Sequence, residues 1–253
     1  MLHTAGATRP EERIAAVPAR RSLSIVIPAY NEERRLPPTL ERISEFLAGA
    51  GYDGEVIVVD DGSRDRTPDV LAELRPRHPR LRVLRHPMNT GKGFAVRAGV
   101  LAATRDAVLL CDADLSTPIE EVDRLWRWVE RGYDVVLGSR ALPRSELAVK
   151  QPLHRRGMGR VFNLLVSLTC VRGIRDTQCG FKLFRSAAAR ETFGSLKTFG
   201  FAFDVEILVR SRRLGHRLAE VPVRWSDMPG SRIRPLRDSC RMAMEIVRIG
   251  TRV

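Results

Sequence analysis

The 253-residue chain is poor in aromatic residues and in cysteine, and both shortages exclude classes of protein. Aromatic residues make up 6% of the sequence, too few for a basic surface with interleaved aromatic rings, so no nucleic-acid partner is expected. The four cysteines, Cys111, Cys170, Cys179 and Cys240, show no CxxC spacing. We therefore expect reduced thiols in a cytosolic setting, with neither zinc ligands nor disulfides.

Long apolar stretches are also missing. No run approaches the ~18 apolar residues of a membrane-spanning helix. The N-terminus lacks the apolar region of a secretory signal. Residues 1–21 are rich in Ala, Arg, Pro and Glu, which is typical of a loose tail. The sequence therefore predicts a protein that is neither secreted nor membrane-spanning.

Positive charge, by contrast, is abundant. The 43 Lys and Arg residues exceed the 30 Asp and Glu residues and give a formal net charge of +13. This balance indicates anionic partners, such as nucleic acid, a phosphorylated substrate or an acidic membrane surface. A solvated Arg-rich surface is an equally good explanation for most of the charge. Because aromatic residues are scarce, the phosphorylated substrate and the membrane surface are favoured over nucleic acid.

Short β-branched runs alternate with helical patterns through the first half of the chain. We expect strands at Leu23–Ile27, Glu55–Val59, Leu81–Leu84, Ala107–Cys111 and Asp134–Leu137. We expect helices at Pro37–Leu47, from Thr67 as N-cap with Pro68 at N1, at Gly93–Ala103, and at Ile119–Glu130 after the capping pair Thr117-Pro118. This alternation predicts right-handed βαβ units and an α/β fold with a mostly parallel sheet.

The second half of the chain has a less regular pattern. We expect a polar loop at Pro143–Pro152, an amphipathic basic segment at Arg155–Cys170, a helix at Phe203–Leu214, an antiparallel strand at Arg217–Trp225, and a last amphipathic helix at Asp238–Arg248. No linker separates the halves. The sequence therefore predicts one domain over residues 22–236, after the tail 1–21 and before an amphipathic C-terminal helix in 237–253 that suits a membrane interface.

Carboxylates occur where three of the predicted strands end. Glu32 follows the first strand, Asp60 and Asp61 the second, and Asp112 and Asp114 the fourth. Because parallel strands end at one edge of a sheet, these groups are expected in one cleft, where their like charges repel unless a cation compensates them. Mg²⁺ is usually held by one or two carboxylates plus substrate phosphates, so the pattern predicts a metal–diphosphate site.

Several motifs occur in a fixed order from about Leu23 to Val247. They are Ser24–Glu32, Val56–Ser63, Asn89–Phe94, Leu109–Ser116, Gly138–Arg140, Asp176–Lys182 and Gly200–Glu206. With these motifs the chain resembles an inverting glycosyltransferase of family 2 with the GT-A fold, a Rossmann-like, mostly parallel sheet flanked by helices. Within that family it is most similar to enzymes that move a sugar from a nucleotide onto a polyprenyl (dolichyl-type) phosphate.

The resemblance implies that Asp112-Ala113-Asp114 binds a divalent metal, Mg²⁺ or Mn²⁺, together with the donor diphosphate. Asp114 is the implied metal ligand, Asp112 lies near the ribose or metal-bound water, and Ser116 occupies a further position used toward the metal. The competing interpretation is that one aspartate only caps the helix after Pro118.

The resemblance also implies a set of nucleotide contacts. These are Pro28, Tyr30, Glu32, Val59, Asp60, Asp61, Lys92, Asp112 and Ala113. One of Asp60 and Asp61 is expected to face the base, and the sequence does not decide which. In the motif around Lys92, glycines permit a close backbone approach and the lysine suits a phosphate, although a plain turn into a helix also explains it.

For the acceptor, the resemblance implies a group of basic and polar residues. They are Arg140, Arg155, Arg156, Asp176, Gln178 and Asp204. Arg140 is the implied phosphate contact, with Arg155 or Arg156 as the second cation. A solvated helix face explains that second arginine equally well.

The implied catalytic residues are Asp114, Arg140, Glu206 and Arg232. Arg232 lies in a late segment where relatives often use a lysine to return to the diphosphate. Asp204 and Glu206 stand where many sugar transferases keep a base, but a phosphate acceptor is already anionic near neutral pH. We therefore expect catalysis by positioning and leaving-group stabilisation, with Glu206 orienting basic groups.

The sequence is interpreted as a peripheral enzyme on the cytoplasmic face of a membrane that transfers glucose from UDP-glucose to polyprenyl phosphate with inversion. Two motifs, Asp176–Lys182 and Phe201–Glu206, look more like glucosyl than mannosyl members. The alternatives are a GDP-mannose donor, a soluble or polysaccharide hydroxyl as acceptor, and a nucleotide-sugar-binding regulator without catalysis. The hydroxyl acceptor would require Asp204 or Glu206 as base. No oligomeric state is indicated.

Overall fold

The computed structural model describes residues 21–149 and 173–228, together with Glu245 and Ile249. The predictions for Arg155, Arg156 and Arg232, and for the amphipathic segments at 155–170 and 237–253, concern positions outside this range or almost wholly outside it. Arg21, which was assigned to the N-terminal tail, belongs to the folded part, because its guanidinium donates a hydrogen bond to Asp123 at 2.6 Å.

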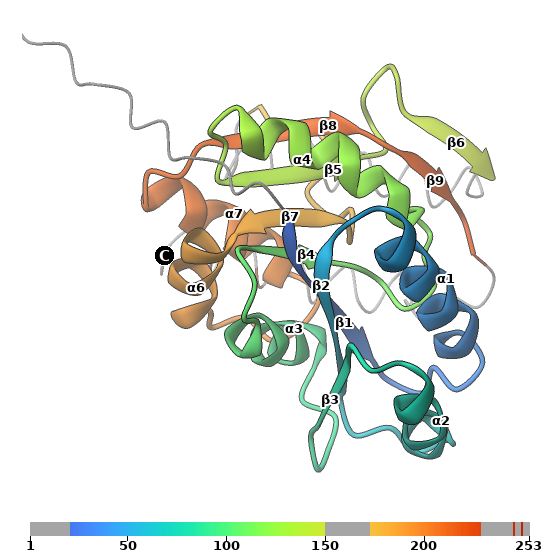
Figure 1. Cartoon of the computed structure of the whole chain (residues 1–253). Coiled ribbons are helices and arrows are strands. Elements are labelled where there is room, and N and C mark those ends of the chain that lie inside the picture. The colour runs from blue at the N-terminus through green and yellow to red at the C-terminus, as the bar shows by residue number, and fades with distance from the viewer. Residues whose placement is uncertain (1–20, 150–172, 229–244, 246–248, 250–253) are drawn as a thin grey trace, which may run out of the picture.

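The centre of the molecule is a seven-stranded sheet with the order β3-β2-β1-β4-β7-β5-β8 (Figure 1). The strands are β1 Ser22–Ala29, β2 Asp53–Asp60, β3 Leu81–Arg85, β4 Ala107–Leu110, β5 Val135–Ser139, β7 Lys182–Arg185 and β8 Leu218–Pro222. All neighbouring strands are parallel except the two pairs that β7 makes with β4 and β5. The predicted fold class, an α/β fold with a mostly parallel sheet, is confirmed.

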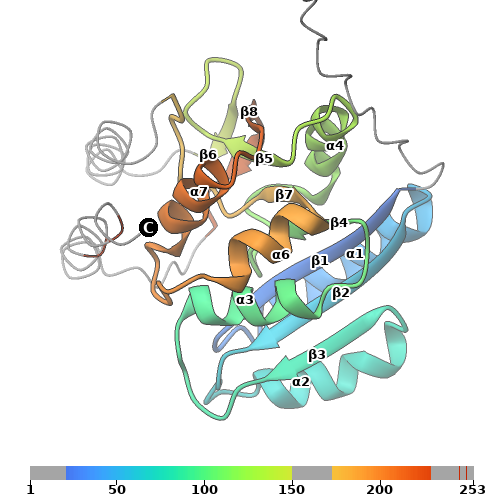
Figure 2. The same ribbon diagram turned by 90° about the vertical axis from the view of Figure 1, so that its left-hand side faces the viewer.

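Helices cover both faces of the sheet (Figures 1 and 2). One face carries α1 Leu36–Gly49, α2 Thr67–Leu74 and α4 Val122–Glu130, and the other carries α3 Lys92–Ala102, α6 Ser186–Gly194 and α7 Phe203–Arg213. Short 3₁₀ turns at Arg75–Arg77 and Ile119–Glu121 follow α2 and precede α4. In the described part of the chain, no helix combines the length and apolarity needed to cross a membrane.

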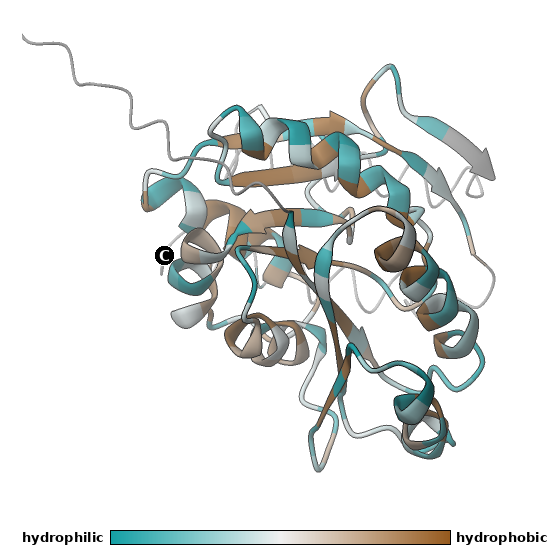
Figure 3. Ribbon diagram, in the orientation of Figure 1, coloured by the Kyte–Doolittle hydropathy of each residue, from teal (hydrophilic) through white to brown (hydrophobic). Residues whose placement is uncertain are grey.

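Two apolar cores lie between the sheet and the helices. Successive side chains of a strand point to opposite faces, so each strand contributes to both cores. In β1, Ile25 and Ile27 pack on the side of α1 and α4, whereas Val26 packs on the side of α3. Figure 3 shows the sheet strands as mainly apolar and the helices as mixtures of hydrophobic and hydrophilic residues. The sheet is therefore buried on both faces, and its polar chemistry is confined to its edges and ends.

The direction of β7 decides what lies at one end of the sheet. Because β7 runs against its neighbours, its first residue, Lys182, pairs with Leu110 near the end of β4 and with Leu137 in β5. The segment that precedes β7 therefore reaches the same edge as the carboxyl ends of β1, β2, β4 and β5. This end of the sheet, where the carboxyl ends of the parallel strands lie, is called here the C-terminal edge. It brings together motifs that are far apart in the sequence.

The second half of the chain differs from the sequence prediction in three ways. Residues expected as one antiparallel strand form β8, which is parallel to β5, and a separate strand β9 Arg224–Ser226. The expected polar loop contains the strand β6 Glu146–Val149, which pairs in parallel with β9. Neither β7 nor α6 was predicted. The strands β6, β7 and β9 have three or four residues and carry charged residues, so they show neither a clear two-residue periodicity nor an apolar run like that of β4.

Thr67 does not act as the N-cap of α2. It is the first residue of the helix, and its hydroxyl accepts a hydrogen bond from the Glu32 N–H at 2.8 Å. The N–H of Thr67 donates instead to the Asp65 carboxylate at 3.0 Å. The threonine therefore connects α2 to the loop that follows β1.

Candidate active site

The loops that follow β1 and β2 are joined at the C-terminal edge by Asn31. Its side-chain oxygen accepts a hydrogen bond from the Arg64 N–H at 2.7 Å, and its own N–H donates to the Ser63 hydroxyl at 2.8 Å. Asn31 has a φ of 55°, in the left-handed region that asparagine tolerates better than most residues. These contacts fix the loops that carry Tyr30 and Asp61.

Asp60 is fully buried, and its two carboxylate oxygens differ in their surroundings. Oδ1 accepts a hydrogen bond from the Ser63 N–H at 2.9 Å and closes the turn at Gly62. Oδ2 lies 3.3 Å from Nε of Arg85 but has no hydrogen-bond partner among the described residues. A buried acceptor without a hydrogen bond is costly, and the nearby Arg85 guanidinium offsets part of that cost.

Asp61 is also buried, but its carboxylate is occupied by the chain itself. It accepts hydrogen bonds from the N–H groups of Thr90 at 3.0 Å and of Gly91 at 2.8 Å, and it lies 2.9 Å from Nδ1 of His86. The side chain therefore shapes the loop before α3. Of the two aspartates that the sequence did not separate, Asp60 is the one with a carboxylate oxygen that accepts no hydrogen bond from the described residues.

Five other predicted nucleotide contacts lie along this part of the edge. Pro28 pairs with Val59 in the β1–β2 ladder, and the Val59 side chain is buried in the core beneath α3. Tyr30 is half-buried, and the Glu32 carboxylate pairs with the arginine three residues later at 3.3 Å. The Ala113 carbonyl accepts a hydrogen bond from a threonine hydroxyl of α1 at 2.8 Å. Val59 thus supports the strand from within the core.

The glycines on either side of Lys92 allow another loop of the chain to pack closely against the backbone. A Cβ at Gly91, whose φ is 115°, would lie 2.4 Å from the carbonyl oxygen of Phe199, and a Cβ at Gly93 would lie 2.6 Å from that of Thr198. The Gly93 N–H donates to the Phe199 carbonyl at 2.8 Å. The close backbone approach predicted for a phosphate is therefore made by residues 198–199, which fix the main chain on both sides of Lys92.

Lys92 and Asp112 form an ion pair at this edge. Nζ of Lys92 lies 2.6 Å from Oδ1 of Asp112. A Cβ at Gly180 would lie 2.0 Å from Oδ2, so the carboxylate rests directly against the Gly180 backbone. Burial tends to raise the pKa of Asp112, but the Lys92 cation lowers it below its usual value. Burial likewise tends to lower the pKa of Lys92, and Asp112 raises it, so both groups are charged near neutral pH.

Asp114 lies on a tight turn after β4, where Leu115 has a φ of 47°. Its Oδ1 accepts hydrogen bonds from the N–H of Ser116 at 3.0 Å and from its hydroxyl at 2.8 Å. Across residues 21–149 and 173–228, no group of three or more His, Cys, Asp or Glu could hold a metal ion alone. Two carboxylates and a hydroxyl fit a Mg²⁺ or Mn²⁺ ion that takes its other ligands from a diphosphate and water.

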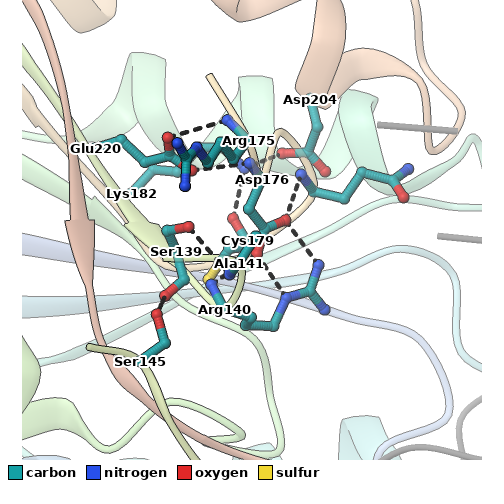
Figure 4. A network of polar contacts seen from close by, with 11 residues as sticks. Ser139, Arg140, Ala141, Ser145, Arg175, Asp176, Cys179, Lys182, Asp204 and Glu220 are labelled. Carbon is teal, nitrogen blue, oxygen red and sulfur yellow. Dashed lines mark hydrogen bonds and ion pairs between the residues drawn. The ribbon is translucent and has the colours of Figure 1, made fainter. Parts of the chain in front are cut away.

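Arg140 is held by the carboxylate of Asp176 (Figure 4). Its Nε and Nη2 donate to the two oxygens of Asp176 at 2.7 and 2.9 Å, and its own N–H donates to the same carboxylate at 2.9 Å. The guanidinium lies 5.4 Å from the ring centre of Trp225. The N–H of Gln178 donates to Asp176 at 3.3 Å, and the Asp176 N–H donates to Glu220 at 2.8 Å. Asp176 therefore supports Arg140.

The charge of Asp176 is secured by this arrangement. Burial alone would raise the pKa of its carboxyl, but the Arg140 guanidinium lowers the pKa to about 2. Burial opposes the charge of Arg140 in the same way, and Asp176 raises the pKa of the guanidinium. The pair stays ionised across the physiological range and presents a fixed cation at the C-terminal edge.

Lys182 and Asp204 form a second buried ion pair (Figure 4). Nζ of Lys182, which has no exposed surface, lies 2.6 Å from Oδ1 of Asp204 and 2.5 Å from the Cys179 carbonyl oxygen. A buried charge is stable only when it is paired and hydrogen-bonded. Asp204, which was predicted to contact the acceptor, is therefore already paired with a cation.

Glu206 faces a loop of the chain. Its carboxylate accepts hydrogen bonds from the N–H groups of Lys197 at 2.9 Å and Thr198 at 2.7 Å, and from Nε of Arg210 at 2.6 Å. Burial tends to raise the pKa of Glu206, but these hydrogen bonds lower it below its usual value. Glu206 thus holds the loop that packs against Gly91 and Gly93, and these partners do not include the Lys92–Asp112 pair.

Sequence reasoning assigned no role to Lys182 or Trp225. Lys182 ends a motif that was recognised, and the apolar residues around it were the available signal that it is buried. Its position beside Asp204 depends on the reversed direction of β7, which a four-residue strand does not reveal. Trp225 was assigned to a strand, and nothing in the sequence indicated that its ring lies near Arg140.

The chain is similar to proteins of known family. Residues 24–193 match glycosyl transferase family 2. Dolichyl-phosphate beta-glucosyltransferase of Dictyostelium discoideum is 38% identical over 239 residues, which cover 90% of this chain and 73% of that protein. The protein of the same name from Drosophila melanogaster is 39% identical over 245 residues, which cover 91% and 74%. The chain thus spans about three quarters of the length of these relatives.

The fold is similar to that of solved glycosyltransferases. Glucosyl-3-phosphoglycerate synthase from Mycobacterium tuberculosis, in complex with Mn²⁺, UDP and glucosyl-3-phosphoglycerate, has a TM-score of 0.68 at 23% identity, covering 98% of this chain and 85% of that one. At this identity the likeness concerns the fold, and the sequence relatives establish the family. The chain belongs to glycosyl transferase family 2 and is a glycosyltransferase with the GT-A fold.

Proposed function

We propose that this glycosyltransferase moves glucose from UDP-glucose to the phosphate of a dolichol or a related polyprenol, with inversion at the anomeric carbon. The sugar and the acceptor are those in the name of its sequence relatives, which are 38–39% identical. The observation that carries the proposal is the arrangement of two ion pairs at one sheet edge. Lys92–Asp112 suits a diphosphate with its metal, and Arg140–Asp176 offers a fixed cation to a second phosphate.

The donor is proposed to bind across the ends of β1, β2 and β4. Oδ2 of Asp60, which is buried beside Arg85 and has no hydrogen-bond donor among the described residues, is proposed to accept a hydrogen bond from the base. The loops joined by Asn31 form the surface on which the base lies. Asp112 and Asp114, with Ser116 nearby, are the residues that would hold a Mg²⁺ or Mn²⁺ ion. The ion would neutralise charge on the leaving diphosphate.

The acceptor phosphate is proposed to bind at Arg140. Asp176 uses both of its oxygens on the guanidinium, so the arginine keeps its position and its remaining N–H groups are available to the phosphate. Asp176 therefore acts as a positioning residue. Arg155 and Arg156 remain proposed second cations, and Arg232 remains a proposed contact of the diphosphate.

The reaction is proposed to proceed without a strong general base. Oδ1 of Asp204 already accepts a hydrogen bond from the buried Lys182 at 2.6 Å. Glu206 is engaged by the loop at 197–198 and by Arg210. A phosphate monoester has already lost the protons that matter near neutral pH and needs no base. These contacts favour a phosphate over a hydroxyl as the attacking group.

One experiment tests the donor and the acceptor together. The protein is incubated with Mg²⁺ or Mn²⁺, with UDP-glucose or GDP-mannose, and with dolichyl phosphate, dolichol or 3-phosphoglycerate. We expect radiolabelled glucose in the lipid fraction only with UDP-glucose and dolichyl phosphate. Transfer to dolichol would contradict the phosphate acceptor, and transfer to 3-phosphoglycerate would show a soluble phosphate acceptor instead.

The enzyme is also proposed to bind the surface of a membrane, because the lipid tail of the acceptor stays in a bilayer. Basic residues near an anionic leaflet contribute roughly 1 kcal/mol each, and salt screens them. We expect sedimentation with anionic liposomes at low salt, weaker binding at high salt, and loss of binding when residues 237–253 are removed. Failure to bind anionic liposomes at low salt would contradict this part of the proposal.

A further inference from the structure

Lys92 forms an ion pair with Asp112, one of the carboxylates that a metal would use. Its ammonium donates to Oδ1 of Asp112 at 2.6 Å, and the Gly180 backbone lies against Oδ2 of the same carboxylate. The aspartate thus lies between a cation and the main chain, with 37% of its side chain exposed. A divalent ion that approaches Asp112 in the absence of nucleotide must compete with the ammonium for the same charge.

The Lys92 side chain has a second carboxylate within its electrostatic reach. Asp204 attracts the same ammonium, and the Asp204 carboxylate is kept in place by the buried Lys182. The main chain around Lys92 is fixed through the contacts of Gly91 and Gly93 with residues 198–199. Movement of this charge is therefore confined to the four flexible carbons of the lysine side chain.

The Arg140–Asp176 pair shows what a permanent ion pair looks like at this edge. Arg140 makes three hydrogen bonds to its aspartate, whereas Lys92 makes a single one to Asp112. A planar guanidinium held by two parallel bonds keeps one geometry, but an ammonium on a flexible stem can change partner. The two pairs therefore differ in how readily they exchange.

We propose that Lys92 is an exchangeable counter-ion of Asp112, which excludes free divalent metal and releases the carboxylate when the metal arrives together with the nucleotide diphosphate. The inference rests on the proposed function, in which a metal and a diphosphate bind at Asp112 and Asp114. When the diphosphate is present, its oxygens offer the ammonium a new partner, so that Lys92 exchanges one anion for another. Without the diphosphate, the metal displaces Lys92 with no such compensation.

The test measures Mn²⁺ binding from the electron paramagnetic resonance signal of the free ion, with and without UDP. Without UDP, we expect Lys92→Met to bind Mn²⁺ about tenfold more tightly than the wild type, because a charge-assisted hydrogen bond no longer competes. With Mn²⁺ present, we expect the same variant to bind UDP about tenfold more weakly, because the diphosphate loses its lysine. The sign of the effect thus reverses with the ligand.

Two further variants serve as controls. Lys92→Arg keeps the charge and should bind free Mn²⁺ as weakly as the wild type does. Arg85→Gln removes one positive charge from the same edge, where Arg85 lies 3.3 Å from Asp60, and should leave binding of free Mn²⁺ nearly unchanged. Thermal unfolding confirms that each variant is folded, and Lys92→Gln replaces the methionine variant if that one is not.

The outcomes separate this inference from the proposed function. If the wild type and Lys92→Met bind free Mn²⁺ equally and both bind Mn²⁺ with UDP, the counter-ion role is wrong and the metal–nucleotide site stands. If Arg85→Gln gains as much Mn²⁺ affinity as Lys92→Met, the effect is one of net charge and the inference is also overturned. If no form binds Mn²⁺ even with UDP, both the inference and the proposed metal role fail.

Discussion

The two halves of the C-terminal edge hold their carboxylates in different ways. At the end of β2, Asp60 and Asp61 accept hydrogen bonds from backbone N–H groups of their own loop and of the loop before α3. Beyond the end of β4, Asp112 is held by the side-chain cation of Lys92. Before β7, Asp176 is held by the guanidinium of Arg140 and also accepts the Arg140 N–H. Backbone donors therefore predominate around the carboxylates of the first half, and side-chain cations hold Asp112 and Asp176 in the second.

This difference suggests that one half of the edge recognises the shape of a ligand and the other recognises its charge. A carboxylate that accepts backbone amides changes only if the loops themselves move, so the first half provides a fixed surface for a planar base. A carboxylate paired with a side-chain cation can change partner when a ligand brings a different charge. Charged ligands, the diphosphate and the acceptor phosphate, are accordingly proposed to bind in the second half.

The largest effect is expected from the second half, at Asp114. We expect Asp114→Ala to lower glucose transfer by about a hundredfold or more, because the metal that stabilises the leaving diphosphate loses a ligand. The fold should persist, since removal of one carboxylate relieves repulsion in the metal-free protein. Initial rates at saturating Mn²⁺ measure the effect, and excess chelator should abolish wild-type transfer.

The matched control is Asp69→Ala, which removes an exposed aspartate in the first turn of α2. We expect this variant to retain the wild-type rate. Full turnover by Asp114→Ala, or by the wild type in excess chelator, would show that the carboxylates of the second half do not serve a metal.

A smaller effect is expected when Arg140, the proposed acceptor cation, or its partner Asp176 is changed. Arg140→Ala should lower transfer at limiting acceptor about ten- to a hundredfold, since one charge-assisted contact contributes ~1.5–3 kcal/mol. Asp176→Asn should raise the acceptor KM in the same direction, because it loosens the guanidinium without touching the phosphate. Calorimetry with UDP should show nearly unchanged affinity in both variants.

A split between these two variants would sharpen the comparison. If Asp176→Asn lowers kcat at saturating acceptor while KM is unchanged, Asp176 contacts the reacting groups and its role is catalytic. If Arg140→Ala weakens UDP binding and leaves acceptor saturation normal, Arg140 belongs to the donor half of the edge.

The sequence predicted the structure of the N-terminal part of the chain better than that of the C-terminal part. The strands β1, β2 and β4 are apolar runs that end in carboxylates, and both their existence and their common edge follow from periodicity and parallel connections. The aspartates at these strand ends were therefore expected at the edge where the structure places them. What periodicity does not give is the hydrogen-bond partner of each oxygen, so Asp60 and Asp61 could not be distinguished.

The structure of the C-terminal part of the chain depends on contacts that leave no pattern in the neighbouring sequence. β7 is only four residues long and carries a basic residue at each end, so neither its presence nor its direction was predicted. Its reversed direction places Lys182 beside Asp204. Gly180 cannot carry a Cβ because the Asp112 carboxylate leaves no room for one, which is evident only from the position of Asp112 in the structure.

A moderate effect on nucleotide binding is expected from a change at Asp61, in the first half of the C-terminal edge. An asparagine there would replace one acceptor oxygen with an NH₂ group facing backbone N–H donors, so the loop before α3 should loosen. We expect UDP to bind Asp61→Asn several-fold more weakly, about tenfold at most, with an unchanged KM for the acceptor. Hydrogen exchange of the Thr90 and Gly91 amides should become faster. Unchanged protection of these amides would contradict the shaping role.

The smallest effect on transfer is expected at the opposite end of the sheet. Glu55, near the start of β2, accepts hydrogen bonds from the Ser24 hydroxyl and the Thr104 N–H, both at 2.7 Å, and from Arg82 at 2.7 Å. Burial tends to raise the pKa of Glu55, but these donors lower it to about 2. Glu55→Gln should leave kcat unchanged and lower the free energy of unfolding near neutral pH by about 3 kcal/mol.

The sign of the pH dependence makes this last prediction specific. Because the folded pKa of Glu55 lies below its ordinary value of 4.5, the contribution to stability is fully present above about pH 4.5 and is lost as the pH falls toward 2. The difference in unfolding free energy between the wild type and Glu55→Gln should therefore shrink over that interval. Glu73→Gln, in an exposed ion pair with Arg66, should cost about 0–1 kcal/mol. A difference for Glu55→Gln that stays constant from pH 7 to pH 3 would show that the glutamine variant loses packing rather than a charge held by hydrogen bonds.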